Sequence, residues 1–356
     1  MNVLMCCSDL SYKGGMVSVV RNYLGSDAWP EGTHIIFVPT HRQAGKAGLI
    51  WCFAKAVARI RRMARAGEID VAHLHVAERG SFVRKGLLVR MLHRFGIPVV
   101  LHHHGAEFEE WYASRGPRAR RWIDSILAEA DVNIVLSPRL IPMITAKAPW
   151  ARVEAVYNAV ATLPANPYGT DARGVLFLGR LGVRKGTFDL LEAMRRIDGD
   201  LPEDVRFYLC GDGAVDEVRA RVNEMGLSLR VAHIGWIDGR QKEEILRSTM
   251  INVLPSYNEG LPMTILETMA RGIPNLSTPV ASIPEVITDG ETGLLVPPGD
   301  VGALASALRR LILDPGLRRH ISDASFTLIG ERFSLPVSVA RVNAIYTALA
   351  GRKTEL

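Results

Sequence analysis

The sequence contains little cysteine and no long apolar run, and these absences exclude several classes of protein. Its 356 residues include 4 Cys, too few for a disulfide framework in a chain of this length. No stretch reaches the ~18 uninterrupted apolar residues of a membrane-spanning helix. The opening residues MNVLMCC lack the positively charged segment of a signal peptide. We therefore expect a cytoplasmic protein in a reducing compartment, with no segment that crosses a bilayer.

What the chain does contain is typical of a folded protein with two domains. Hydrophobic residues make up 48% and charged residues 22% of the sequence, which excludes a disordered or collagen-like chain. The net charge of +6 is unevenly distributed. Residues 1–158 carry 21 basic and 13 acidic side chains, whereas residues 159–356 carry 22 and 24. The positive excess therefore lies in the first half.

Short runs rich in Val, Ile and Leu alternate with longer helical patterns along most of the chain, which is typical of parallel sheets covered by helices. The predicted strands are 2–7, 34–39, 71–76, 99–103 and 132–137, and then 175–179, 206–210, 231–234, 251–255 and 275–278. The predicted helices are 15–24, 48–66, 82–95, 118–130, 139–146, 187–197, 214–225, 241–248, 262–271, 301–313 and 336–349. Residues 158–174, rich in Ala, Pro, Asn and Gly, are interpreted as a linker. The pattern predicts two doubly wound, Rossmann-like α/β domains that face each other across a cleft.

Two glycine-containing turns between a strand and a helix are candidates for phosphate binding. Gly14 and Gly15 follow the first strand, and glycine lets a backbone approach an anion at a helix start. A tight turn that simply requires glycine explains this loop equally well. Gly211 begins a Gly-Asp-Gly turn, but Asp216 stands where a dinucleotide fingerprint needs its third glycine, so an NAD site is not expected.

Arg180 and Lys185 form a more specific pattern, because both cations lie just beyond the strand 175–179 in the segment LFLGRLGVRKG. An Arg fork and a Lys point charge at the carboxyl edge of a parallel sheet suit a diphosphate. A solvated basic loop is the alternative interpretation.

The segment LPSYNEGLPMTILETMARG contains Glu259 and, eight residues later, Glu267 inside a predicted helix. Two carboxylates beside a helix start can bind the hydroxyls of a sugar and a ribose. Backbone N–H groups of Gly260 and Leu261 would face phosphate. Glu267 alone would be read as a surface position of a helix, but the pair favours a binding site.

The ordered set of these motifs resembles the retaining glycosyltransferases of family 4, which have the GT-B fold. The resemblance extends over nearly the whole chain and includes VLHHHGAEF, IGWID and TPVASIPEVITDGETGLLVPPGD. It implies an N-terminal acceptor-binding domain of residues 1–158 plus 335–356 and a donor-binding domain of residues 159–334. It also implies that the final helix crosses back onto the N-terminal domain. The linker departs from the family pattern, with Ala159 where the family usually has glycine.

The resemblance also implies roles for the candidate residues. Glu259 would contact hydroxyls of the donor sugar, Glu267 the ribose, and Arg180 and Lys185 the diphosphate. His104 would touch the transferred sugar. Gly14, Gly15, Gly211, Gly260, Leu261 and Trp236 complete the expected donor-binding set.

Two patterns in the sequence resemble metal-binding sites. His73 with His75, and His102 with His104, share strand faces, but no carboxylate or cysteine stands at a recognisable ligand interval, which favours core or hydrogen-bonded histidines over zinc. The segment 198–200 reads Asp-Gly-Asp, yet it follows a helix, away from any strand's carboxyl end, and is interpreted as a solvated turn. We therefore expect neither a metal nor another cofactor.

The segment 46–65 combines six basic residues and no acidic residue with large apolar side chains. Such a helix suits an anionic membrane surface, although an ordinary amphipathic helix packed on a sheet has the same composition. Nucleic acid binding has no recognisable motif here. We expect a peripheral location on the inner face of the cell membrane.

Together these features predict an enzyme that moves a sugar from a UDP- or GDP-sugar to a glycan or lipid-linked oligosaccharide, in exopolysaccharide or cell-surface polysaccharide synthesis. A sugar-nucleotide epimerase or phosphorylase of the same fold and a non-catalytic protein that binds nucleotide sugar remain alternatives.

Overall fold

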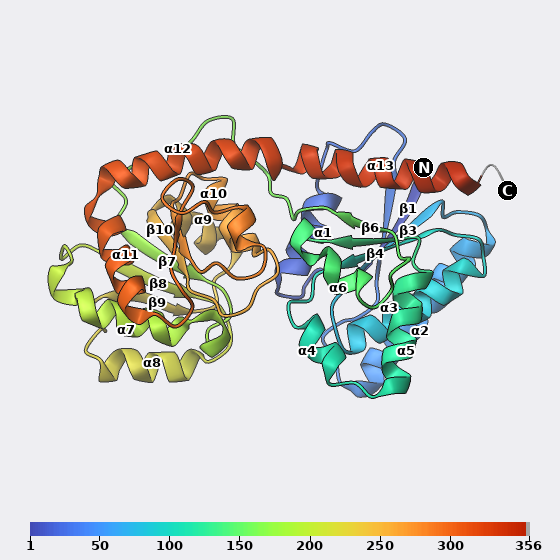
Figure 1. The fold of residues 1–356 in the computed structure, drawn as a ribbon, viewed down its shortest axis with the longest axis horizontal. Coiled ribbons are helices and arrows are strands. Elements are labelled where there is room, and N and C mark those ends of the chain that lie inside the picture. The colour runs from blue at the N-terminus through green and yellow to red at the C-terminus, as the bar shows by residue number, and fades with distance from the viewer. Residues whose placement is uncertain (354–356) are drawn as a thin grey trace. The chain divides into compact units, whose positions relative to one another are not determined.

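The structure is a computed structural model that describes residues 1–353 of the chain. The backbone divides into two compact units. Unit 1 consists of Met1–Ala159 together with the last helix, α13 (Leu335–Lys353). Unit 2 consists of Val160–Ser334. Each unit is a parallel sheet covered by helices on both faces (Figure 1).

The sheet of unit 1 has the strand order β2-β1-β3-β4-β5-β6, with every neighbouring pair parallel. The strands are β1 (Asn2–Cys7), β2 (His34–Pro39), β3 (Val71–Val76), β4 (Val99–His103), β5 (Val132–Val135) and β6 (Val153–Ala155). Helices α2 (Lys46–Arg65), α3 (Gly80–His93) and α5 (Pro117–Glu129) contribute buried residues to a large apolar core. Pro117 occupies the first turn of α5, where its missing N–H costs nothing.

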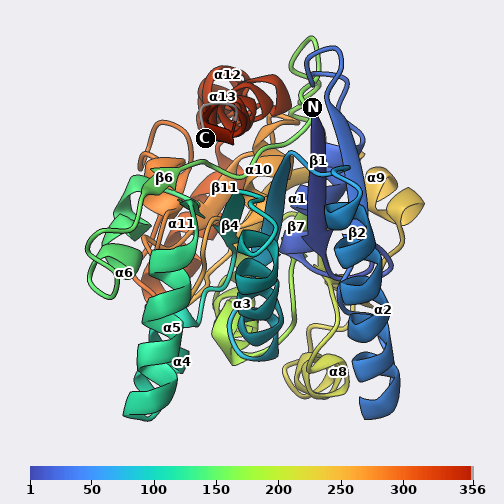
Figure 2. The same ribbon diagram turned by 90° about the vertical axis from the view of Figure 1, so that its right-hand side faces the viewer.

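The opposite face of this sheet is covered by α1 (Gly15–Leu24) and α13, both of which pack near β1 and β3. Figure 2 shows α2, α3 and α5 together in front of the strands of the unit 1 sheet, with α13 at the top of the view. Alternation along β3 sends Ala72 and Leu74 into the large core and His73 and His75 to the α1 and α13 face. One face of β3 is therefore apolar, and the other face carries the histidines.

The sheet of unit 2 has the order β12-β11-β10-β7-β8-β9, again parallel. Its strands are β7 (Gly174–Leu178), β8 (Arg206–Cys210), β9 (Val231–Gly235), β10 (Thr249–Leu254), β11 (Asn275–Ser277) and β12 (Leu294–Leu295). Its α-helices are α7 (Thr187–Ile197), α8 (Val215–Glu224), α9 (Gly239–Arg247), α10 (Met263–Met269), α11 (Val301–Leu313) and α12 (Pro315–Arg332). Asp300 caps α11 by accepting a hydrogen bond from the Ala303 N–H at 2.9 Å.

Several elements differ from the sequence-based expectations. Strands β6 and β12 and helices α4 (Phe108–Ala113) and α12 were not predicted. The two strands have three and two residues, too few to establish a period. In α12 several inward positions are polar: buried Arg318 donates to the carbonyls of Leu311 and Ile312 at the end of α11. A polar inner face conceals the apolar periodicity that predicts helices.

The predicted segment 139–146 is a 3₁₀ turn, Pro138–Leu140, followed by the short helix α6 (Ile141–Thr145). The proposed linker is also not a free connection. Val160 pairs with Ser334, and Tyr168 is buried, donating its hydroxyl to the Met250 carbonyl at 2.9 Å. Most of segment 158–174 thus belongs to unit 2, because its few apolar side chains are packed there.

Candidate active site

The unit 2 candidates lie around the point where its strand order reverses. From β7 the chain proceeds through β8 and β9 on one side, and then returns to place β10 on the other side of β7. Open α/β sheets bind ligands at the carboxyl ends of strands at such a reversal. Lys185 follows β7 and Glu259 follows β10, so the topology brings together two segments that are 74 residues apart.

Lys185 and Glu259 form a buried ion pair. Lys185 Nζ donates to Glu259 Oε1, and the Ser256 hydroxyl donates to the same oxygen at 2.7 Å. The two side chains are only 13% and 6% exposed, so water does little to screen their charges. Burial lowers the pKa of Lys185, while the Glu259 carboxylate beside it acts in the opposite direction. The pair is therefore a fixed cation and a fixed carboxylate at the sheet edge.

Two glycines allow the loops to approach closely enough for this arrangement. Gly186 has φ 69°, and a Cβ there would lie 2.1 Å from the Pro255 carbonyl oxygen. Gly211 has φ 157°, and its Cβ would lie 1.8 Å from the Gly179 oxygen. Because only hydrogen fits at either position, Gly186 lets the Lys185 loop pack on the Glu259 loop. Gly211 supports the loop that carries Arg180.

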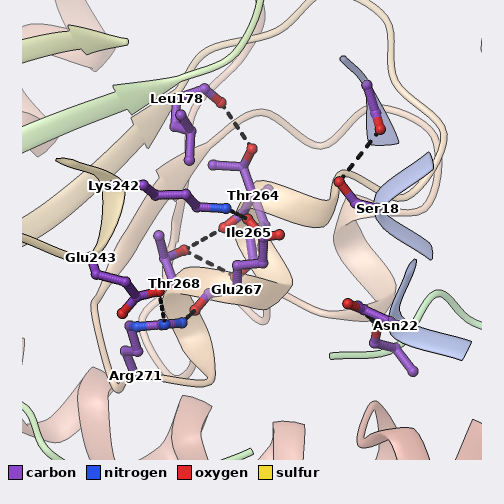
Figure 3. Close-up of polar contacts among 12 residues, drawn as sticks. Ser18, Asn22, Leu178, Lys242, Glu243, Thr264, Ile265, Glu267, Thr268 and Arg271 are labelled. Carbon is purple, nitrogen blue, oxygen red and sulfur yellow. Dashed lines mark hydrogen bonds and ion pairs between the residues drawn. The ribbon is translucent and has the colours of Figure 1, made fainter. Parts of the chain in front are cut away.

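Glu267 lies on α10, where it is paired with a cation that the sequence analysis missed. Lys242 Nζ, on α9, donates to Glu267 Oε2 at 2.6 Å, and Figure 3 shows the two side chains pointing toward each other. Thr264 ties the start of α10 to the end of β7 by donating to the Leu178 carbonyl at 2.9 Å. Lys242 had no signal in the sequence, since it stands on an exposed, highly charged helix 25 residues away.

The other unit 2 candidates are positioned as follows. Arg180 is exposed, in a loop fixed on both sides by backbone hydrogen bonds: the Gly179 N–H donates to Cys210, the last residue of β8, and the Leu181 N–H donates to Asp212 just after it. Trp236 is 50% exposed directly after β9. The Gly260 carbonyl accepts from the Ser282 N–H at 3.2 Å, and Leu261 is buried.

In unit 1, the glycine loop has the backbone that only glycine adopts readily. Gly14 has φ 144°, with nothing within 4 Å of an added Cβ, and it precedes α1 as its N-cap. Gly15 is exposed in the first turn. The conformation explains why glycine is needed at position 14 but is compatible with both a phosphate loop and a plain tight turn.

His104 follows β4, is partly exposed, and contacts a cluster of buried histidines. His104 Nε2 lies 2.9 Å from His75 Nδ1, and His102 Nδ1 lies 3.0 Å from His73 Nε2. Burial lowers the pKa of His104 and of His73 to about 3, so both rings are neutral near pH 7. His103 points to the other face and bonds Asn133 Oδ1 at 3.0 Å. The prediction of hydrogen-bonded histidines is confirmed.

Three of these rings, His73, His75 and His102, place ligand atoms within 4.8 Å of one another. The rings of His73 and His75 are stacked at 4.3 Å with 11° between their planes. An imidazole nitrogen directs its lone pair in the plane of the ring, so two stacked rings cannot both point at one ion without turning. As folded, the cluster suits hydrogen bonding better than zinc.

The Asp-Gly-Asp segment is a 3₁₀ turn with partners of its own. Asp198 Oδ1 accepts from Arg230 Nε at 2.6 Å, and Asp200 Oδ2 accepts from Arg309 Nε at 2.8 Å. The two carboxylates are 43% and 55% exposed, so the prediction of a solvated turn is confirmed, and both also take part in ion pairs.

Comparison with known proteins identifies the class. The model of Glycosyltransferase Family 4 matches residues 13–162, and that of Glycosyl transferases group 1 matches residues 172–314. The lipopolysaccharide core biosynthesis glycosyltransferase LpsE of Rhizobium meliloti is 34% identical over 51% of this chain and 50% of its own. Alpha-maltose-1-phosphate synthase of Mycolicibacterium smegmatis is 30% identical over 67% of this chain and 70% of its own.

Among solved structures, sucrose-phosphate synthase from Thermosynechococcus elongatus superposes with a TM-score of 0.81 at 20% identity, covering 99% of this chain and 100% of that one. This likeness shows that the fold is GT-B. The family matches and the related sequences show that the protein is a glycosyltransferase. The chain belongs to the family 4 glycosyltransferases, as the motif resemblance predicted.

Proposed function

We propose that the protein is a retaining glycosyltransferase that transfers a sugar from a UDP- or GDP-sugar to a hydroxyl of a glycan or lipid-linked oligosaccharide. The observation that carries the proposal is the buried Lys185 and Glu259 pair at the strand reversal of unit 2. A fixed cation matches a diphosphate, and a fixed carboxylate beside it matches sugar hydroxyls.

In the proposed reaction the bond between the sugar's anomeric carbon and the diphosphate oxygen breaks, and the acceptor oxygen bonds to that carbon on the same face. The acceptor proton passes to an oxygen of the departing diphosphate. Lys185 and Arg180 stabilise the negative charge that develops on the leaving group. Glu267, held by Lys242, orients the ribose, and His104 contacts the transferred sugar.

We further propose that transfer needs no metal, because Lys185 and Arg180 supply the positive charge that a divalent ion would otherwise provide. Transfer that is unchanged after chelation with EDTA is the expected result. A loss of transfer that added Mg²⁺ or Mn²⁺ restores would contradict this part.

The first experiment is a thermal-shift screen over UDP- and GDP-sugars, since a ligand that binds the folded state raises the melting temperature. With the donor that gives the largest shift, Lys185→Met is expected to abolish most transfer. Lys147→Met is the matched control, since Lys147 is also a buried lysine in an ion pair, with Glu109 Oε1 at 2.7 Å. Full transfer by Lys185→Met would refute the assignment. NMR of the product's anomeric configuration tests retention.

The other two classes of function give different products. An epimerase would convert the free sugar nucleotide without an acceptor, which chromatography of the nucleotide pool detects. A non-catalytic binding protein would show a thermal shift but neither transfer nor hydrolysis.

For the acceptor, we propose a lipid-linked glycan at the inner face of the cell membrane, in exopolysaccharide or cell-surface polysaccharide synthesis. Helix α2 supports this location. Its second half packs Ile60 and Met63 into the core, whereas Ile50 and Trp51 are 72% and 58% exposed. Arg61, Arg62 and Arg65 line a hollow of about 590 Å³ on the same helix. No helix among residues 1–353 is long and apolar enough to span a membrane. The name of the relative LpsE refers to lipopolysaccharide core biosynthesis.

Liposome flotation tests the membrane contact. Basic residues near an anionic surface contribute about 1 kcal/mol each, so neutralising Arg59, Arg61, Arg62 and Arg65 together is expected to reduce binding to vesicles with anionic lipid by at least about tenfold. A variant with Arg219, Arg240, Arg247 and Arg319 of unit 2 neutralised is the charge-matched control. Equal binding by both variants and the wild type would refute the contact.

A further inference from the structure

His75 is fully buried and in direct contact with the candidate active-site histidine. It stands on β3, next to β4, and its Nδ1 lies 2.9 Å from His104 Nε2. The His104 backbone N–H also donates to the Val76 carbonyl at 2.8 Å. Main chain and ring of His104 are thus both held by β3, which leaves Nδ1 as the ring nitrogen available to a ligand.

The ring of His75 is itself fixed by its surroundings. It stacks on His73 with centroids 4.3 Å apart, and His73 Nδ1 contacts the Tyr346 hydroxyl on α13. Tyr23, on α1, packs against His75 with centroids 6.3 Å apart. The rings of His73 and Tyr23 thus pack against His75, and in this packing its Nδ1 faces His104.

Counting protons assigns the tautomers. Burial lowers the pKa of both histidines, so each neutral ring carries one proton. Within residues 1–353, His75 Nε2 is buried without a hydrogen-bond partner. A proton on this atom would be a buried N–H without an acceptor, an arrangement that folded proteins rarely tolerate. The proton of His75 therefore resides on Nδ1 and is donated to His104 Nε2.

We propose that His75 is a positioning residue that holds His104 in its Nδ1–H tautomer, so that His104 donates a hydrogen bond to a hydroxyl of the transferred sugar and does not act as a base. This inference rests on the proposed function, which gives His104 its contact with the sugar. It goes further by assigning the direction of that hydrogen bond and the residue that sets it.

The tautomer can be measured without any activity. In ¹⁵N-histidine-labelled protein, long-range ¹H–¹⁵N spectra distinguish a protonated ring nitrogen from an unprotonated one, and comparison with His104→Asn assigns the signals. A protonated Nδ1 on His104 is expected in the wild type. A protonated Nε2 on His104 would overturn the proposal whatever reaction the protein catalyses.

Two conservative variants test the positioning role. The side-chain amide nitrogen of His75→Asn takes the place of Nδ1 and can still donate to His104. In His75→Gln the amide lies near the place of Nε2, which removes this donor. His75→Gln is expected to lower kcat by about 10- to 100-fold, with the KM of the sugar nucleotide changed less than about threefold, since His75 does not touch the substrate. His75→Asn is expected to restore most of kcat.

The matched control is His103→Gln, because His103 is a buried histidine at the end of the neighbouring strand β4 that faces the opposite side of the sheet and bonds Asn133. It is expected to lower the melting temperature without lowering kcat. Equal kcat losses in His75→Gln, His75→Asn and His103→Gln would show a merely structural role and overturn the proposal. If the wild type transfers no sugar at all, the proposed function fails, while the NMR measurement still decides the tautomer.

Discussion

Breaking the pair between Lys185 and Glu259 gives the sharpest test of the site's physical basis. In Lys185→Met the Glu259 carboxylate stays buried, with the Ser256 hydroxyl as its remaining side-chain donor. Removing one partner of a buried ion pair costs about 3–5 kcal/mol, because the other charge is left uncompensated. For a unit of this size that corresponds to a fall in melting temperature of roughly 10 °C.

The double variant Lys185→Met/Glu259→Gln separates this effect from simple loss of packing. With both charges removed, no buried ion is left unpaired, so the double variant is expected to be more stable than Lys185→Met alone by at least about 2 kcal/mol. Lys147→Met, whose partner Glu109 is 60% exposed, is expected to cost about 1 kcal/mol or less.

A two-domain chain need not unfold in one step. The differences in the free energy of unfolding are therefore measured for each unit separately, by chemical unfolding monitored, for example, by hydrogen exchange. A double variant that is less stable than both Lys185→Met and Glu259→Gln would refute the reasoning. In transfer assays Lys185→Met, Glu259→Gln and the double variant are each expected to lose at least about 100-fold in kcat/KM, the usual loss when one group that stabilises transition-state charge is removed. The control Lys147→Met is expected to keep its kcat/KM.

Three further predictions concern single side chains. Burial lowers the pKa of Lys85 from 10.5 to about 8. Lys85→Met is therefore expected to raise the free energy of unfolding by up to about 3 kcal/mol at pH 7. This gain declines toward pH 10, where the unfolded chain also loses the proton, and melting curves recorded against pH test it. The Cβ of Gly211→Ala would clash with a backbone oxygen at 1.8 Å, so this variant is expected to lower the free energy of unfolding by about 3 kcal/mol or more. The control Gly239→Ala, with open space around the residue, is expected to be neutral or mildly stabilising. An unchanged free energy of unfolding in Gly211→Ala would contradict the clash. Lys242→Met, which removes the partner of Glu267, is expected to raise the KM of the sugar nucleotide by about tenfold with little change in kcat, and a change in kcat alone would argue against ribose positioning.

The alternating pattern of apolar runs and helices predicted both sheets, because strands buried on both faces have a strong signal. Elements whose stability comes from polar contacts or neighbours were missed, as α12 and the two-residue β12 show. The pattern also placed Lys185 and Glu259 at the ends of β7 and β10. It could not show that they pair with each other, since that depends on which strands are neighbours in the sheet.

The same limit applies to residues that act only through others. Lys242 stands on a charged, exposed helix, and no local pattern distinguishes it from Arg240 or Lys residues elsewhere. His75 was noted for sharing a strand face with His73, but its contact with His104 requires the register between β3 and β4. Register is a property of the packed sheet, where side-chain volumes and strand order decide it.

The ion pair also constrains how a donor enters the proposed site. A diphosphate that takes up Lys185 must compete with Glu259 for the same ammonium, and it brings negative charge close to a carboxylate that is 6% exposed. Two interactions can offset this repulsion: the ammonium has three N–H groups and can bind both anions at once, and sugar hydroxyls can donate to Glu259. A nucleoside diphosphate without its sugar supplies only the first. The intact sugar nucleotide is therefore expected to bind more tightly than the free diphosphate, and Glu259→Gln should reduce that difference.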